Sequence, residues 1–215
     1  MKIALLAATG RAGQTILNEL ISRGHQVTAV ARDLAKLPKE RPETVVPVQD
    51  DLSDANRIAE IIHGSDAVVS AVGAPRNDPD ADTDVLLWIS ERIVTAVRQS
   101  GTPRLIVVGG CGSLWLSPGI KVIDSEYWPK SLVPIARSHM KVLEALKTSE
   151  INWTYVSPPM LIDLGERTGR YRLGGDELII DDQGKSWISF EDYAIALVDE
   201  LEKPAHERAR FSVGH

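Results

Sequence analysis

The sequence predicts an α/β fold with a doubly wound parallel sheet, and three observations favour it. Short apolar segments alternate with amphipathic helical segments over most of the chain, which is the pattern of repeated strand–helix–strand units. The first apolar segment leads directly into a glycine-containing turn and a helix. The length of 215 residues, 43% of them hydrophobic, suits one domain with a full core. We therefore expect a single domain over residues 1–215, with ligands at the carboxyl ends of its strands.

Apolar periodicity and helix start and stop signals define the individual elements. Continuous apolar runs predict strands buried on both faces, Gly24 marks a helix end, and Ser53 marks a helix start. In chain order we expect strand 2–6, helix 14–23, strand 26–32, strand 44–49, a helix from 53 to about 62, strand 66–71, helix 84–99, strand 104–108, helix 134–147 and strand 153–156.

The C-terminal part departs from this alternation. Segments 169–173, 178–180 and 186–188 are short and lie between glycine- and aspartate-rich turns, so we interpret them as small strands. We expect residues from about 160 to 190 to form a small substrate-side lobe. Ser189 and Asp192 resemble a capping box that opens a helix running to about residue 202, and a last strand near 210–213 closes the sheet.

The turn after the first strand has the residues of a dinucleotide-binding loop. Such loops use glycines for a tight turn, for close approach of the pyrophosphate and for packing of helix on strand. Gly10 and Gly13 fit the last two roles, whereas Ala7 stands where the first glycine is usual. The turn must then use a backbone conformation that a Cβ permits. Free N–H groups at the helix start favour an anion here, so we expect a Rossmann-type nucleotide domain.

The residue at the end of the second strand indicates which dinucleotide binds. Sites specific for NAD place an acidic residue there to bond the ribose 2′-hydroxyl. Here Ala31 is followed by Arg32, and a guanidinium can fork onto a 2′-phosphate, with Arg11 as a second cation. We therefore expect NADP(H) as cofactor. The alternative interpretation of Arg32 is a solvated strand end.

Composition narrows the class of partner. The formal net charge of −6, with no basic stripe interleaved with aromatics, argues against nucleic acid and favours a small-molecule substrate. Cys111 is the single cysteine, so no intramolecular disulfide forms. No apolar stretch approaches the roughly 20 residues that span a bilayer, and no N-terminal signal pattern is seen. We expect a cytoplasmic protein without a membrane anchor, and no side-chain spacing typical of a metal site.

Several segments resemble those of the NADH-flavin reductases, a family within the atypical short-chain dehydrogenases/reductases whose relatives include biliverdin reductase B and the NmrA-like proteins. The N-terminal motif Ala-Thr-Gly-Arg-Ala-Gly is shared by many reductases, whereas Gly-Gly-x-Gly-Ser-Leu and Gly-Glu-Arg-Thr-Gly are more specific. The chain departs from the family pattern at Ala7 and at Cys111, where a small residue such as alanine is common. The segments that carry the resemblance are 8–13, 107–114, 156–159, 165–171 and 188–194.

The resemblance implies a role for each matching position. It assigns the pyrophosphate to Thr9, Gly10, Arg11, Ala12 and Gly13, and the 2′-phosphate to Arg32. It assigns the adenine edge to Asp51 and Leu52, the adenosine ribose side to Ala71, Val72 and Gly73, and the nicotinamide to Pro158 and its neighbours. Asp51 has an alternative interpretation as an acid that favours a helix start.

Classical members of the superfamily pair a tyrosine with a lysine four residues later, and this sequence has no such pair. Lys141 lies where the lysine is expected, but Arg137 stands four residues before it. Oxidised flavin accepts hydride at N5 without a positioned phenol, so free flavin (FMN, FAD or riboflavin) or a similar planar acceptor such as a quinone or tetrapyrrole fits better.

Two side chains are candidates to assist this chemistry. Ser113 can donate a hydrogen bond to the acceptor, and His139 can deliver a proton near neutral pH. The alternatives are a turn-forming serine and a surface histidine. Cys111 has no base partner in the sequence, and we interpret it as a small buried residue. Trp115, Trp128 and Met160 have two alternative interpretations, as a surface on which a planar ring stacks or as ordinary core residues.

The leading functional hypothesis is therefore an NADPH-dependent reductase of flavin or of a similar planar acceptor. A non-catalytic NADP(H) sensor of the NmrA-like kind is the alternative, because the missing tyrosine–lysine pair agrees equally with it. An epimerase- or dehydratase-like enzyme acting on a nucleotide sugar ranks lower, since the chain is short and lacks that tyrosine.

Overall fold

A mostly parallel sheet forms the centre of the computed structural model, which describes residues 1–75 and 82–215. The strand order is β10-β12-β8-β5-β4-β1-β2-β3, and every neighbouring pair is parallel except β10 with β12. The doubly wound α/β prediction is thus confirmed. The strands of this sheet are β1 (Lys2–Leu6), β2 (Gln26–Ala31), β3 (Val45–Gln49), β4 (Ala67–Ser70), β5 (Leu105–Val108), β8 (Trp153–Ser157), β10 (Arg172–Gly174) and β12 (Ala209–Gly214).

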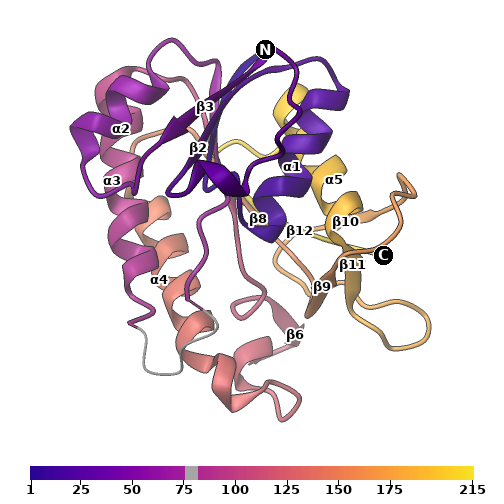
Figure 1. Cartoon of the computed structure of the whole chain (residues 1–215). Coiled ribbons are helices and arrows are strands. Elements are labelled where there is room, and N and C mark those ends of the chain that lie inside the picture. The colour runs from indigo at the N-terminus through magenta and orange to yellow at the C-terminus, as the bar shows by residue number, and fades with distance from the viewer. Residues whose placement is uncertain (76–81) are drawn as a thin grey trace.

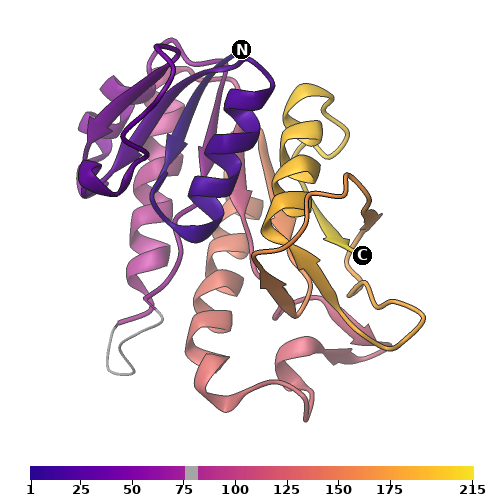
Figure 2. The same ribbon diagram turned by 45° about the vertical axis from the view of Figure 1, so that its right-hand side comes forward.

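Helices cover both faces of the sheet (Figure 1). On one face lie α2 (Ala55–Ile62), α3 (Val85–Ser100) and α4 (Val133–Thr148), and on the other lie α1 (Arg11–Ser22) and α5 (Phe190–Glu202). Figure 2 shows α1 and α5 side by side. Each face has its own apolar core, so the central strands are buried on both sides, as their continuous apolar runs predict.

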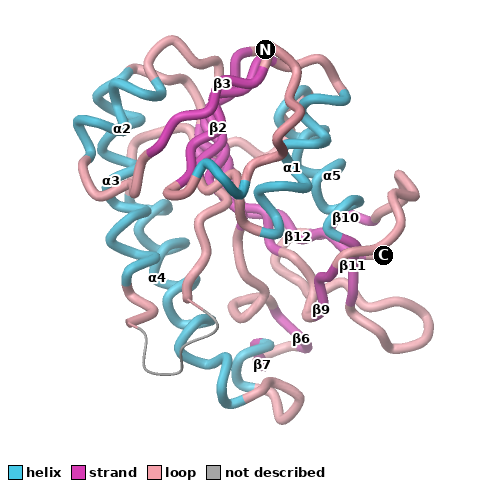
Figure 3. The backbone as a smooth tube through the Cα atoms, viewed as in Figure 1, coloured by secondary structure: helices cyan, strands magenta, loops and turns pink. Residues whose placement is uncertain are grey.

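Small elements gather at the end of the sheet where the parallel strands finish (Figure 3). The pair β6 (Trp115–Ser117) and β7 (Ile120–Lys121) is antiparallel, and β9 (Leu161–Asp163) pairs in parallel with β11 (Trp187–Ser189). Short 3₁₀ helices cover Leu34–Lys36, Val122–Asp124 and Lys130–Leu132. These additions lie beyond the carboxyl edge of the sheet.

Some predicted elements differ from the structure. The first helix begins at Arg11 rather than at residue 14, because Gly10 already occupies the cap position. The cap of α2 is Asp54 and not Ser53, since the Asp54 carboxylate accepts the Asn56 amide. Segment 178–180 is not a strand: Glu177 makes an isolated parallel bridge with Trp115 of β6, and the Leu178 amide bonds to the Trp115 carbonyl.

The C-terminal part also differs in how it joins the sheet. The segment predicted as a lobe strand near 169–173 appears as β10 and pairs with β12 of the main sheet. Ser189 caps α5 as expected, with its hydroxyl accepting the Asp192 amide. The Asp192 carboxylate does not accept the Ser189 amide in return, as it would in a full capping box. It accepts hydrogen bonds from Thr168 and Gly169 and so fixes the segment before β10.

Candidate functional site

The turn from β1 into α1 is closed by backbone bonds. The Ala8 amide bonds to the Val30 carbonyl at 2.9 Å, and the Gly10 amide bonds to the Ala7 carbonyl at 3.1 Å. Ala7 has a φ of 61°, in the left-handed region that a Cβ disfavours by roughly 1–2 kcal/mol. The turn therefore uses a conformation that a Cβ permits, but only at this cost.

The two glycines of the turn have different surroundings. A Cβ built at Gly13 would overlap the Ala7 carbonyl oxygen, so this glycine lets α1 pack onto the turn. A Cβ at Gly10 would lie 3.5 Å from the same oxygen, an ordinary contact. Gly10 caps α1 with no side-chain hydrogen bond and no acidic residue in the first turn. The amides of Arg11, Ala12 and Gly13 therefore fit an anion such as a pyrophosphate, with Thr9 beside them.

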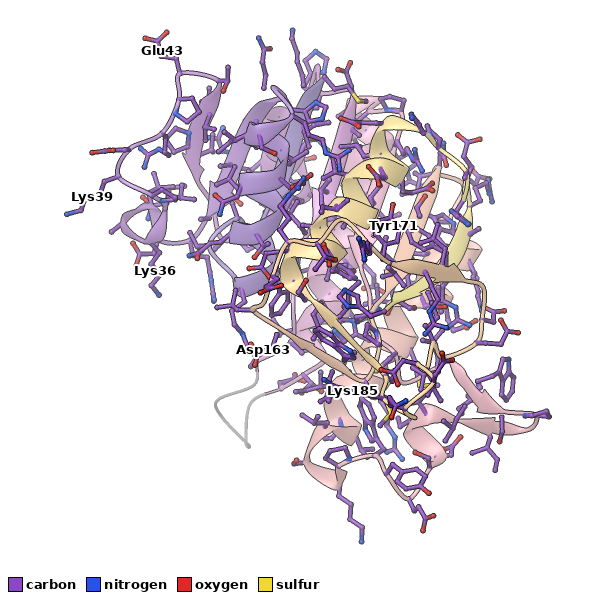
Figure 4. All side chains as sticks on the ribbon, turned by 90° about the vertical axis from the view of Figure 1, so that its right-hand side faces the viewer. Lys36, Lys39, Glu43, Asp163, Tyr171 and Lys185 are labelled. Atoms are coloured by element: carbon purple, nitrogen blue, oxygen red, sulfur yellow. The ribbon has the colours of Figure 1, made fainter. Side chains whose placement is uncertain are left out.

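The two arginines expected at the 2′-phosphate lie in different places. Arg32 is exposed at the end of β2, and its side chain makes no hydrogen bond or ion pair with any residue that the structure describes. Arg11 instead lies 3.7 Å from Asp163 of β9 and stacks over the Phe190 ring at 5.8 Å. Figure 4 shows Asp163 on the C-terminal part of the molecule. Arg11 is therefore engaged with β9 and α5, whereas Arg32 stays exposed at the end of β2.

The loop after β3 is built from interlocking carboxylate turns. The Asp50 carboxylate accepts the Leu52 amide at 2.7 Å, and the Asp51 carboxylate accepts the Ser53 amide at 3.0 Å. Hydrogen bonds from Ser53 hold the pKa of Asp51 below its usual value. Leu52 is buried with a φ of 62°. These bonds explain Asp51 structurally, and its carboxylate remains exposed beside Arg32.

Two further loops reach the same edge. After β4, the Ala71 amide bonds to the Leu6 carbonyl at 3.0 Å, which brings Ala71, Val72 and Gly73 beside the glycine turn. After β8, Pro158 is buried, and the Ser157 hydroxyl is buried without a hydrogen-bond partner among the described residues. The structure therefore brings the sequence-predicted cofactor residues to one edge of the sheet.

The loop after β5 is packed more tightly than its sequence suggests. A Cβ at Gly109 would overlap the Tyr155 ring, and one at Gly112 would lie 2.8 Å from the Ala136 side chain. The Gly110 amide donates to the Tyr155 hydroxyl at 2.9 Å. Both Cys111 and His139 are buried here. Cys111 agrees with its prediction, whereas the surface interpretation of His139 is wrong, because its ring packs against Gly110.

Ser113 contacts a residue that sequence reasoning missed. Its hydroxyl accepts a hydrogen bond from Arg210 of β12 at 2.7 Å, and Arg210 also bonds to the Asp176 carboxylate. The His139 ring nitrogen lies 3.5 Å from the Tyr155 hydroxyl, deeper in the fold. Ser113 and His139 are therefore held by different partners on the same side of the sheet. The signal that the sequence offered was a charged residue, Arg210, at the start of the predicted strand 210–213.

The tyrosine hydroxyls are engaged within the protein or exposed on its surface. Tyr155 and Tyr193 are fully buried, and burial raises the pKa of each above its usual value. Tyr193 donates to the Val156 carbonyl, and Tyr171, which is labelled in Figure 4, donates to Asp199 of α5. The Tyr127 side chain is 69% exposed. Lys141, which stands where the lysine of the classical pair is expected, bonds instead to Asp84 at 2.6 Å.

Apolar side chains line the region beyond this edge. Trp128 and Met160 pack against a small core that contains Cys111 and Leu114, which favours the core-packing interpretation for both. Trp115 is more exposed, as are Ile120 and Leu161. No three His, Cys, Asp or Glu side chains group as metal ligands within the described ranges. No helix found there is long and apolar enough to cross a membrane.

Comparison with known proteins agrees with this geometry. The model of a family described as NAD(P)H-binding matches residues 7–204. The chain belongs to this NAD(P)H-binding family. It is 36% identical over 217 residues to the protein YwnB of Bacillus subtilis, covering 99% of this chain and 98% of YwnB.

Two solved structures extend the comparison. A protein of Streptococcus pneumoniae, described as a candidate NADH-flavin reductase, is 36% identical with a TM-score of 0.87, and the match covers 100% of this chain and 99% of that one. A protein of Bacteroides thetaiotaomicron, described as a candidate epimerase, is 38% identical with a TM-score of 0.90, covering 100% and 96%. The resemblance seen in the sequence is confirmed, and the protein is an NAD(P)H-binding oxidoreductase.

Proposed function

We propose that the protein is an NADPH-dependent reductase that transfers hydride to free flavin or to a similar planar acceptor, such as a quinone or tetrapyrrole. The observation that carries this proposal is the contrast between the two halves of the site. The dinucleotide end has a helix start free to bind phosphate and an exposed, unpaired Arg32. At the other end, no tyrosine of the described residues has a hydroxyl positioned to protonate an alkoxide.

The chain's own residues bind and orient the reactants. The amides at the start of α1 hold the pyrophosphate, and Arg32 forks onto a 2′-phosphate. The nicotinamide, when bound, supplies the hydride. Ser113 accepts from Arg210, so its own proton is available to donate to an acceptor above the loop. Rate then comes mainly from the alignment of two flat rings.

The relatives' names do not decide between a reductase and an epimerase, so the choice rests on the side chains of the site. The Streptococcus pneumoniae relative carries the flavin reductase name and the Bacteroides thetaiotaomicron relative the epimerase name, at nearly equal identity. Acid–base work on a sugar hydroxyl needs a side chain of adjustable pKa within hydrogen-bond reach. Three tyrosines of this chain are bonded internally and the fourth, Tyr127, is largely exposed. The geometry therefore favours an acceptor that needs no such group.

The test is turnover. NADPH oxidation is followed anaerobically with FMN, FAD, riboflavin and small quinones, and NADH is run in parallel. We expect flavin-dependent oxidation that prefers NADPH. Binding of NADPH without turnover for any acceptor would instead identify a sensor and would contradict the proposal.

A further inference from the structure

Two neighbouring side chains of the sheet hold the loop at residues 109–113 from beneath. Tyr155 of β8 accepts the Gly110 amide at 2.9 Å, and Arg210 of β12 donates to the Ser113 hydroxyl at 2.7 Å. Tyr155 and Arg210 are direct partners in the register of these parallel strands. The two side chains therefore extend from adjacent positions to opposite ends of one loop.

Each holding residue is itself fixed by further contacts. The Tyr155 hydroxyl donates to the His139 carbonyl at 3.1 Å, which joins the loop to α4. Arg210 bonds through Nε to the Asp176 carboxylate at 2.7 Å. The Asp176 carbonyl accepts the Trp115 amide at 2.8 Å. A hydrogen bond between groups fixed in this way loses little further entropy when it forms, so the loop has one preferred shape.

The position of the loop gives this arrangement a functional meaning. Residues 109–113 follow β5, which lies between β4 and β8 in the sheet. The loop is therefore flanked by Ala71–Gly73 after β4 and by Pro158 after β8, the segments assigned to the ribose side and to the nicotinamide. Its shape decides where Ser113 can meet an acceptor.

We propose that Tyr155 and Arg210 are positioning residues of the reductase, which hold loop 109–113 in the shape that hydride transfer requires. This inference rests on the proposed function for its catalytic consequence, but the holding of the loop can be measured without any activity. Neither residue touches substrate. Each acts through the loop, Tyr155 on its backbone and Arg210 on Ser113.

Cys111 provides the direct measurement, because it is the single cysteine and only 6% exposed in the middle of the loop. Its alkylation by iodoacetamide, followed by intact mass, reports how often the loop opens. We expect Tyr155→Phe, Ser113→Ala and Arg210→Met to speed alkylation by about tenfold or more, the scale of losing one hydrogen bond to a buried or charged group. NADPH should slow alkylation of the wild type.

Arg104→Met is the matched control. The Arg104 side chain is 7% exposed and pairs with Glu200, and that of Arg210 is 8% exposed and pairs with Asp176, but Arg104 precedes β5 at the opposite end of the sheet. Both variants lose a buried guanidinium, so both lose global stability. Only Arg210→Met should expose Cys111 under native conditions. Equal acceleration in Arg104→Met, or none in the three loop variants, would overturn the proposal.

Kinetics then separate positioning from cofactor binding. We expect kcat for flavin reduction to fall about threefold to tenfold in Tyr155→Phe and Arg210→Met, with the NADPH Kd unchanged. Should Arg210→Met not fold, Ser113→Ala breaks the same contact in the alkylation measurement without removing a charge, and Tyr155→Phe alone carries the kinetic test. A loss of NADPH affinity equal to the loss of kcat would contradict a positioning role. If the wild type reduces no acceptor, the proposed function fails, while the alkylation rates still decide whether these residues hold the loop.

Discussion

Gly13 lies against the carbonyl oxygen of Ala7 so closely that a Cβ at Gly13 would overlap it. Three residues earlier, a Cβ at Gly10 would find an ordinary contact at 3.5 Å. The two glycines therefore serve different ends. Gly13 is needed for the fold of the turn, whereas Gly10 stands at the exposed helix start where phosphates would approach.

We accordingly expect Gly13→Ala to destabilise the protein and Gly10→Ala to leave stability nearly unchanged, within about 1 kcal/mol. Overpacking against a backbone oxygen typically costs about 1–3 kcal/mol. Gly10→Val should remain folded and lose NADPH binding, because its side chain stands between the amides and the phosphates. Urea unfolding and NADPH titration of the three variants test this. Normal NADPH affinity in Gly10→Val would show that the phosphates bind elsewhere.

Ala7 and Ser113 show which features of this site could be predicted from the sequence and which could not. The glycine spacing predicts the turn, the helix start and their place at the edge of the sheet, because all three depend on local backbone geometry. The strain at Ala7 is invisible locally, since the spacing of the motif is kept whichever residue stands there. The Ser113–Arg210 contact joins residues 97 positions apart in the chain, and no periodicity encodes such a pair. The short strands β6, β7 and β9 were missed because two or three residues carry no readable alternation.

Arg32 should determine the choice between NADPH and NADH. Its side chain is exposed and makes no hydrogen bond or ion pair within residues 1–75 and 82–215, although Asp51 lies near it, so it is available to a 2′-phosphate. Arg32→Ala should weaken NADPH binding by roughly 1.5–3 kcal/mol, the scale of a hydrogen bond to a charged group, and leave NADH nearly unchanged. Titration of both cofactors gives the answer, with Lys36→Ala as an exposed control nearby. An equal loss for NADH would mean that Arg32 serves the shared adenosine or the fold.

Glu200 should make part of the stability depend on pH. Burial raises its pKa, but hydrogen bonds from His206, from the Ala205 amide and from Arg104 outweigh burial, so the folded pKa lies below the usual 4.5. A depressed carboxyl pKa contributes stability that is present above the unfolded value and lost as the pH falls through the folded one. The urea concentration at the unfolding midpoint should therefore decrease as the pH is lowered below about 4.5. Glu200→Gln should weaken this dependence of the urea midpoint on pH. An unchanged dependence would show that it comes from other carboxylates, such as Glu19 and Asp199.

The final prediction concerns the tyrosines, because it separates hydride transfer to a planar ring from carbonyl reduction. A general acid or base usually contributes about 10²–10⁴-fold to turnover. Tyr155, Tyr171 and Tyr193 direct their hydroxyls to groups inside the protein, and Tyr127 is largely exposed. Phe at each of the four should therefore lower flavin-dependent turnover by less than about tenfold. The steady-state kcat of each folded variant, checked by circular dichroism, is the measurement. A hundredfold loss at Tyr127 would reveal a phenol that moves onto the substrate, and a carbonyl acceptor would then replace flavin as the better explanation of the site.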